Sequence, residues 1–230
     1  MKTKTTTLLL LLAFVMNSGF RGKPGNDMVP AGPADKEGNA PFTLARSDDD
    51  ISIYIRWIPV NETRSARQLK AEFVMDCPAE HIISALRDEK TYTQWMKATK
   101  EYYRIKTISA DQWYSYVQFS IPWPLNNKDC VLKYEVRDLR ESGKTEITLV
   151  SEPGLLRANE GIERISHMSG SWVITRLGNT KTHIAYYIFS KQAPRYPAWI
   201  TDPLIQRNLL RTMSSFRDFV LSNSSIRETQ

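Results

Sequence analysis

Three histidines and two cysteines are the residues best suited to acid–base, nucleophilic or metal chemistry, and none has a partner at a catalytic spacing. His81, His167 and His183 fall on one expected helix and two late strands, without the spacing of metal ligands. No Gly-x-Ser-x-Gly, His-Glu-x-x-His, Cys-x-x-Cys or phosphate-loop motif occurs. We therefore expect no catalytic residue, no metal and no cofactor.

The two cysteines are Cys77, at the end of an expected strand, and Cys130, near the start of another. An exported protein could pair them, but the sequence does not place their Cα atoms within bridging distance. We expect two unpaired, partly buried thiols. The acidic run Asp48–Asp50 is more typical of a solvated segment than of a metal site.

Arg164 is the charged residue whose position relative to the apolar core is most informative. The alternation of Ile162, Arg164, Ser166 and Met168 puts it on the same strand face as apolar neighbours. A buried arginine needs a partner, which could be the polar head of a ligand or an acid of the protein. The remaining alternative is an arginine at a cavity rim that reaches water.

The first residues have the pattern of an export signal. Lys2 and Lys4 precede a nine-residue apolar run, Leu8–Met16, and small or polar residues follow. That run is too short to span a bilayer, which needs about 20 residues. We expect a signal peptide over residues 1–19 and a secreted or periplasmic protein. The Pro- and Gly-rich stretch 20–46 predicts a flexible linker, 47–225 a single domain, and 226–230 a tail.

The net charge of the chain is +6, with basic and acidic residues interspersed along it. Such mixing is typical of a solvated surface rather than of a nucleic-acid footprint, so no nucleic-acid partner is expected. Transient attraction to anionic lipid headgroups stays open.

Alternation of apolar and polar residues predicts a mainly antiparallel β protein. A helix is expected from residue 78 to Trp95, with a break near Thr91, and Thr201-Asp202-Pro203 predicts the start of a long C-terminal amphipathic helix. The expected strands cover 51–58, 68–75, 101–108, 112–121, 131–139, 145–151, 161–177 and 182–191. Together these elements predict an α+β protein whose curved sheet wraps around the last helix.

The segment Ile121–Val131 carries two prolines around Trp123 and then Lys128-Asp129. Proline donates no backbone hydrogen bond, so this segment predicts a rigid corner between two strands. It resembles the corner of the START family (steroidogenic acute regulatory protein-related lipid transfer domains), which carries Trp-Pro and then Arg-Asp; Lys128 replaces the usual arginine. Four further segments resemble family motifs in the expected order: Lys70–Pro78, Tyr92–Met96, Met168–Trp172 and Tyr196–Ile200.

This resemblance implies the helix-grip fold and a cavity that holds one lipid or other hydrophobic molecule between the sheet and the last helix. For any single apolar residue, ordinary core packing is the simpler interpretation. The residues expected to bind the ligand come from the inner faces of the strands and of the last helix: Trp113, Val117, Leu132, Tyr134, Leu149, Arg164, Met168, Trp172, Leu209, Met213 and Phe216.

Two further expectations follow from the resemblance. Some sterol-binding members carry an acid and an arginine where this chain has Ser115 and Tyr134, which favours a mostly neutral ligand. Leu155 and Leu156 lie in the loop that covers the cavity mouth in START proteins, so we expect them to gate it and to touch the membrane; packing on the last helix is the alternative. A lipid carrier is the expected function, and a polyketide cyclase or aromatase using the same pocket and a non-catalytic interaction module are the alternatives.

Overall fold

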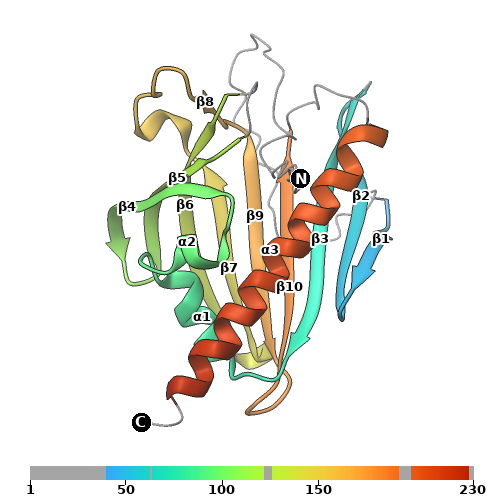
Figure 1. Ribbon diagram of the computed structural model, residues 1–230, viewed down its shortest axis with the longest axis vertical. Helices are drawn as coiled ribbons and strands as arrows, with labels where there is room; N and C mark the ends of the chain where they lie inside the picture. The colour runs from blue at the N-terminus through green and yellow to red at the C-terminus, as the bar shows by residue number, and fades with distance from the viewer. Residues whose placement is uncertain (1–39, 63, 122–125, 192–197, 228–230) are drawn as a thin grey trace, which may run out of the picture.

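The computed structural model describes residues 40–62, 64–121, 126–191 and 198–227. The expected signal peptide, most of the expected linker and the Pro-Trp-Pro corner lie outside these residues. A single large sheet forms the body of the protein, and a long C-terminal helix crosses its inner face (Figure 1). The strands are β1 Thr43–Asp48, β2 Ile51–Asn61, β3 Arg64–Met75, β4 Thr99–Ser109, β5 Gln112–Phe119, β6 Lys128–Leu139, β7 Lys144–Ser151, β8 Glu163–Arg164, β9 Met168–Arg176 and β10 Thr182–Ser190.

The strand order is β1-β2-β3-β10-β9-β7-β6-β5-β4, and every neighbouring pair along this path is antiparallel. The short strand β8 instead pairs in parallel with the start of β6. Between β3 and β4 lie helices α1, Ala79–Arg87, and α2, Tyr92–Trp95, so the break expected near Thr91 is present. Helix α3 spans Ala198–Arg227. Short 3₁₀ turns follow β6 and β7, at Arg140–Ser142 and Pro153–Leu155.

The main core lies between the sheet and α3. Leu209, Met213 and Phe216 of α3 are fully buried there against inward residues of the strands and of α1 and α2. The predicted α+β helix-grip architecture is therefore confirmed. Among the described residues, none of the helices is both long and apolar enough to cross a membrane.

The linker prediction was wrong for residues 43–46, which belong to β1. This edge strand pairs with β2 through a turn at Asp49 and Asp50, both of which have positive φ. Aspartate tolerates this left-handed conformation better than most residues, which accounts for the acidic run. Nearly all side chains of β1 are exposed, so the strand has no apolar alternation that the sequence could reveal.

The predicted start of the last helix was also wrong. The helix already begins at Ala198, and Pro203 lies inside it. The carboxylate of Asp202, expected to cap the helix, forms an ion pair with Arg67 of β3 instead. The N-terminal part of α3 is thus tied to the sheet by this ion pair.

The predicted strand 161–177 is two strands with a break at residues 165–167. The break is held by Ser151, whose hydroxyl donates to the Ser166 carbonyl (3.0 Å) and accepts from the backbone N–H of Met168 (3.0 Å). Because alternation does not continue through a break, the assignment of Arg164 and Met168 to one face was wrong.

Candidate ligand cavity

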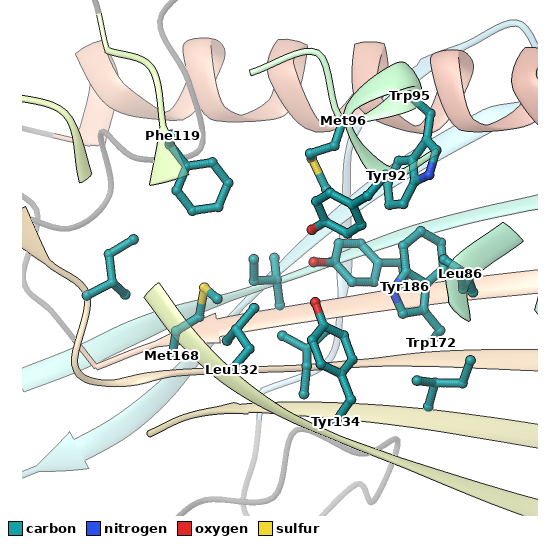
Figure 2. Close-up of a pocket in the computed structure, with 14 residues that line it drawn as sticks. Leu86, Tyr92, Trp95, Met96, Phe119, Leu132, Tyr134, Met168, Trp172 and Tyr186 are labelled. Atoms are coloured by element: carbon teal, nitrogen blue, oxygen red, sulfur yellow. The ribbon is translucent and has the colours of Figure 1, made fainter. Parts of the chain in front are cut away.

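An internal cavity lies between the inner face of the sheet and the helices (Figure 2). Strands β5 to β7, β9 and β10 supply most of its wall, α1 and α2 supply three further residues, and Met96 and Ile165 come from the segments that follow α2 and β8. All of the lining residues are uncharged: Leu86, Tyr92, Trp95, Met96, Phe119, Leu132, Tyr134, Ile147, Leu149, Ile165, Met168, Trp172, Tyr186 and Ile188. The cavity is therefore an apolar chamber, and the lining side chains that carry nitrogen or oxygen atoms are three tyrosines and two tryptophans.

The cavity is small, with a volume of about 40 Å³. One water molecule needs roughly 10–15 Å³ on this measure, so the space holds only a few waters. The interior is filled by stacked aromatic rings instead. Trp172 and Tyr186 stack with ring centroids 4.2 Å apart, and Tyr92 and Tyr102 stack at 3.8 Å.

Five of the residues expected to bind ligand line this cavity: Leu132, Tyr134, Leu149, Met168 and Trp172. Five others are buried in the same core without lining the cavity: Trp113, Val117, Leu209, Met213 and Phe216. The ring of Trp113, for example, stacks on that of Tyr134 at 5.1 Å, and that of Phe216 packs 5.1 Å from that of Trp172. These five would support the wall rather than touch a ligand in this arrangement.

Arg164 does not line the cavity. Its Nε and Nη2 donate to Oδ1 and Oδ2 of Asp129 at 2.6 and 3.0 Å, and the Asp129 side chain is fully buried. Of the roles left open by the sequence, pairing with an acid of the protein is the one observed. These hydrogen bonds raise the pKa of Arg164, although burial opposes the shift, so the guanidinium stays charged.

The same guanidinium also holds the loop that follows β7. It donates to the carbonyl oxygens of Pro153 (3.0 Å), Leu156 (2.9 Å) and Arg157 (3.3 Å). We call Asp129, Arg164 and these three carbonyls the Arg164 latch. Because β6 alternates without a bulge, Asp129 lies on the face opposite Leu132 and Tyr134. The latch is therefore on the outer side of the sheet.

The two leucines of this loop differ in exposure. Leu155 is exposed and Leu156 is half-buried, and neither lines the cavity. The link from loop to cavity runs through Ile165, which follows Arg164 and lines the chamber. Its backbone N–H donates to the carbonyl of Asp129 at 2.8 Å.

Lys128 and Asp129 join β6 to β8. Lys128 Nζ lies 3.3 Å from Glu163 Oε1, beside the pair of Asp129 and Arg164. Across the corner, the N–H of Ile121 donates to Oδ1 of Asn127 at 2.9 Å. The role predicted for Trp123 and its prolines lies outside the described residues.

The cysteines and histidines stand apart from the cavity lining. Cys77 and Cys130 form no disulfide bond and are fully buried, more so than expected. His183 Nε2 pairs with Glu72 at 2.9 Å, and no cluster of three potential metal ligands occurs among the described residues.

Nine of the fourteen residues that line the cavity were not predicted as site residues, and Tyr92 and Tyr186 are the two whose hydroxyl groups matter most. Tyr92 belongs to the Tyr-x-x-Trp segment, which resembles a START motif and therefore indicated the fold rather than the site. Tyr186 alternates with Ile184 and Ile188 along β10, and this apolar alternation was the signal that could have placed it on the inner face.

Comparisons with known proteins bear on the fold. No protein-family model matches the sequence. An uncharacterized protein of Pseudomonas aeruginosa is 23% identical over 178 residues, covering 76% of this chain and 85% of the relative. A STAR-related lipid transfer protein fragment from Xanthomonas axonopodis superposes with a TM-score of 0.68 at 21% identity, covering 78% of this chain and 98% of that one. The chain has a START-like fold.

Two human structures extend the START-like comparison. Human STARD10 gives a TM-score of 0.68 at 17% identity, covering 82% of this chain and 76% of that one. Human StAR-related lipid transfer protein 5 gives 0.66 at 15% identity, covering 80% and 88%. The START-like architecture is thus shared with proteins from bacteria and humans, at identities that show the fold alone.

Proposed function

We propose that the protein binds one hydrophobic small molecule, such as a lipid, in the cavity between the sheet and the helices and carries it. The observation that supports this proposal most is an uncharged, aromatic-lined cavity at the centre of a START-like fold. Burial of apolar ligand surface contributes about 0.8 kcal/mol per CH₂ group, so such a chamber needs no cofactor to bind lipid.

A lipid requires the chamber to widen, since about 40 Å³ is far below the volume of an acyl chain. The four-residue helix α2 is the element we propose to move. It supplies Tyr92 and Trp95 to the wall, and Met96 follows it directly. Methionine is flexible and adapts to irregular spaces, so Met96 and Met168 suit a wall that repacks around a guest.

The carrier proposal is tested by uptake from vesicles. Purified protein is incubated with phosphatidylcholine and phosphatidylglycerol vesicles that contain a neutral fluorescent lipid, separated from them, and weighed by native mass spectrometry. We expect a one-to-one complex and a ligand that moves to acceptor vesicles. Protein that stays ligand-free at every vesicle concentration would contradict the proposal.

We further propose that the loop held by the Arg164 latch gates the cavity and touches the membrane through Leu155 and Leu156. Support comes from the exposure of Leu155 and from the adjacency of Arg164, which holds the loop, to Ile165, which lines the chamber. Changing both leucines to Ser should slow transfer between vesicles severalfold and leave stability nearly unchanged. The control changes two exposed leucines to Ser: Leu139, the last residue of β6, and Leu177, which directly follows β9. Equal transfer rates in the two double variants would contradict the proposal that this loop gates the cavity.

The place of action proposed is outside the cytoplasm, on the basis of the signal pattern in residues 1–19. Cell fractionation followed by N-terminal sequencing tests it. A mature chain that begins near residue 20 in the exported fraction is expected, whereas an intact Met1 in the cytosol would contradict it.

A further inference from the structure

The hydroxyl groups of Tyr92, Tyr134 and Tyr186 converge inside the cavity. Figure 2 shows the three side chains, from α2, β6 and β10, with their oxygen atoms directed toward one another. All three residues line the chamber and are at least nine-tenths buried. Three strong hydrogen-bonding groups thus meet at one point of an otherwise apolar wall.

The Tyr186 hydroxyl makes no hydrogen bond to any of the described residues. Its ring is fixed by stacking on Trp172, so the hydroxyl is held in place facing the chamber. In contrast, the neighbouring Tyr102 donates to the Ser115 hydroxyl at 3.1 Å. A buried hydroxyl without a protein partner loses free energy unless water or a ligand satisfies it.

The surroundings of these hydroxyls favour neutral groups. Burial raises the pKa of Tyr92, Tyr134 and Tyr186, so each stays protonated and can donate. None of the lining residues is charged, and the latch cation Arg164 is bound to Asp129 on the other face of β6. A carboxylate or phosphate placed here would be buried without a counter-ion, which is costly.

We propose that the cavity selects hydrophobic molecules with one neutral oxygen, a hydroxyl or a ketone, which Tyr186 binds together with Tyr134 and Tyr92. This inference rests on the proposed function and specifies its ligand class. The apolar remainder of the ligand lies along the leucine, isoleucine and methionine side chains. Molecules with a charged head are excluded from the chamber.

The test uses ligands of equal chain length. Dodecane, 1-dodecanol, 2-dodecanone, dodecanoate and dodecylammonium are each delivered from cyclodextrin at pH 8, and each competes with bound Nile red, which is an uncharged fluorophore. We expect the alcohol and the ketone to bind about 3- to 10-fold more tightly than dodecane, as one net hydrogen bond allows. Dodecanoate and dodecylammonium should bind more weakly than the alcohol by a factor of at least about 100.

Two tyrosine variants make the assignment specific. Tyr186→Phe should remove the advantage of the alcohol and ketone over dodecane while the affinity for dodecane stays within about twofold. Tyr103→Phe is the matched control, because Tyr103 is exposed and stacks on Tyr116 away from the chamber. It should bind every ligand as the unchanged protein does, and thermal unfolding checks that both variants fold.

The outcomes separate the inference from the proposed function. If dodecanoate binds most tightly, or if Tyr186→Phe keeps the full preference for the alcohol and ketone, the neutral-oxygen inference is overturned and hydrophobic binding stands. If neither Nile red nor any ligand binds, the proposed function falls, and the inference falls with it.

Discussion

The cavity and the Arg164 latch lie on opposite faces of β6, and they differ in whether the protein itself satisfies the hydrogen bonds of their polar groups. In the latch, Asp129 and Arg164 form two hydrogen bonds, and the guanidinium donates to three loop carbonyls as well. In the cavity, the Tyr186 hydroxyl has no partner among the described residues. A polar group that is fully satisfied by the protein holds structure, whereas one left unsatisfied in an apolar chamber is available to a ligand.

The comparison also explains why the ion pair of Asp129 and Arg164 lies on the outer face of β6 and not in the chamber. A guanidinium in the chamber would have to be desolvated and paired there, and the space would then suit an anion. On the outer face the same ion pair fixes a loop and leaves the chamber neutral. The alternation of one strand therefore separates a structural site from a binding site.

The largest effect is expected from breaking the latch. Asp129→Ala leaves Arg164 buried without its counter-ion and should lower the free energy of unfolding by about 3–5 kcal/mol. The matched control is Asp76→Ala, which removes an exposed pair with Lys181 at 3.7 Å and should cost about 0–1 kcal/mol. Urea unfolding followed by tryptophan fluorescence measures both. Equal losses would show that the latch is no more than a surface ion pair.

The next effect concerns Gly170, in the Gly-Ser-Trp segment of β9 and next to the lining residue Leu149. A Cβ here would lie 2.8 Å from the Tyr187 carbonyl oxygen and 3.0 Å from Leu149 Cδ1. Gly170→Ala should therefore cost about 1–3 kcal/mol and weaken ligand binding, because it pushes Leu149 into the chamber. Gly154→Ala is the control, since beyond Gly154 and its two chain neighbours no atom lies within 4 Å of the position that its Cβ would occupy. If both variants behave alike in urea unfolding, close packing at β9 is not what requires glycine.

Alkaline pH distinguishes the buried Tyr186 hydroxyl from an exposed tyrosine hydroxyl, because the two differ in pKa. Burial raises the folded-state pKa of Tyr186 above the unfolded value of about 10. Its contribution to stability is thus complete below about pH 10 and is lost as the pH rises from there toward the folded pKa. Tyr186→Phe should reduce the slope of unfolding free energy against pH, above pH 10, by about one proton. A slope equal to that of the unchanged protein would mean that this hydroxyl ionises in the folded state.

The smallest expected effect distinguishes a residue that lines the chamber from a core residue that does not. Ile147→Val removes a methylene from the chamber wall and should cost about 0.5–1.5 kcal/mol while increasing the uptake of a bulky ligand. Ile53→Val is matched in burial but lies in the core away from the cavity lining. It should cost a similar amount and leave uptake unchanged. Uptake that responds equally to both would place the ligand elsewhere.

The sequence predicted the architecture because apolar alternation marks half-buried strands and because ordered motifs indicated the helix-grip fold. It missed β1, whose pairing with β2 is made by backbone groups under exposed side chains. It joined β8 and β9 because the break depends on hydrogen bonds of Ser151, which comes from another strand. Such long-range contacts leave no local pattern.

The candidate site was predicted less completely than the fold. Residues on regular strands, such as Leu132 and Trp172, were placed on the inner face by alternation alone. Arg164 was misplaced because alternation was extended across an irregular segment. Tyr186 lay within a regular alternation and could have been found, but which inward tyrosine lacks a partner depends on three-dimensional packing.

Mass spectrometry of organic extracts from the native protein, purified from its own cells, tests the central claim most directly. The account predicts one class of hydrophobic molecule at up to one per chain, carrying a neutral oxygen and no charged head. Protein that yields no such molecule, and that takes up none from vesicles, would contradict it.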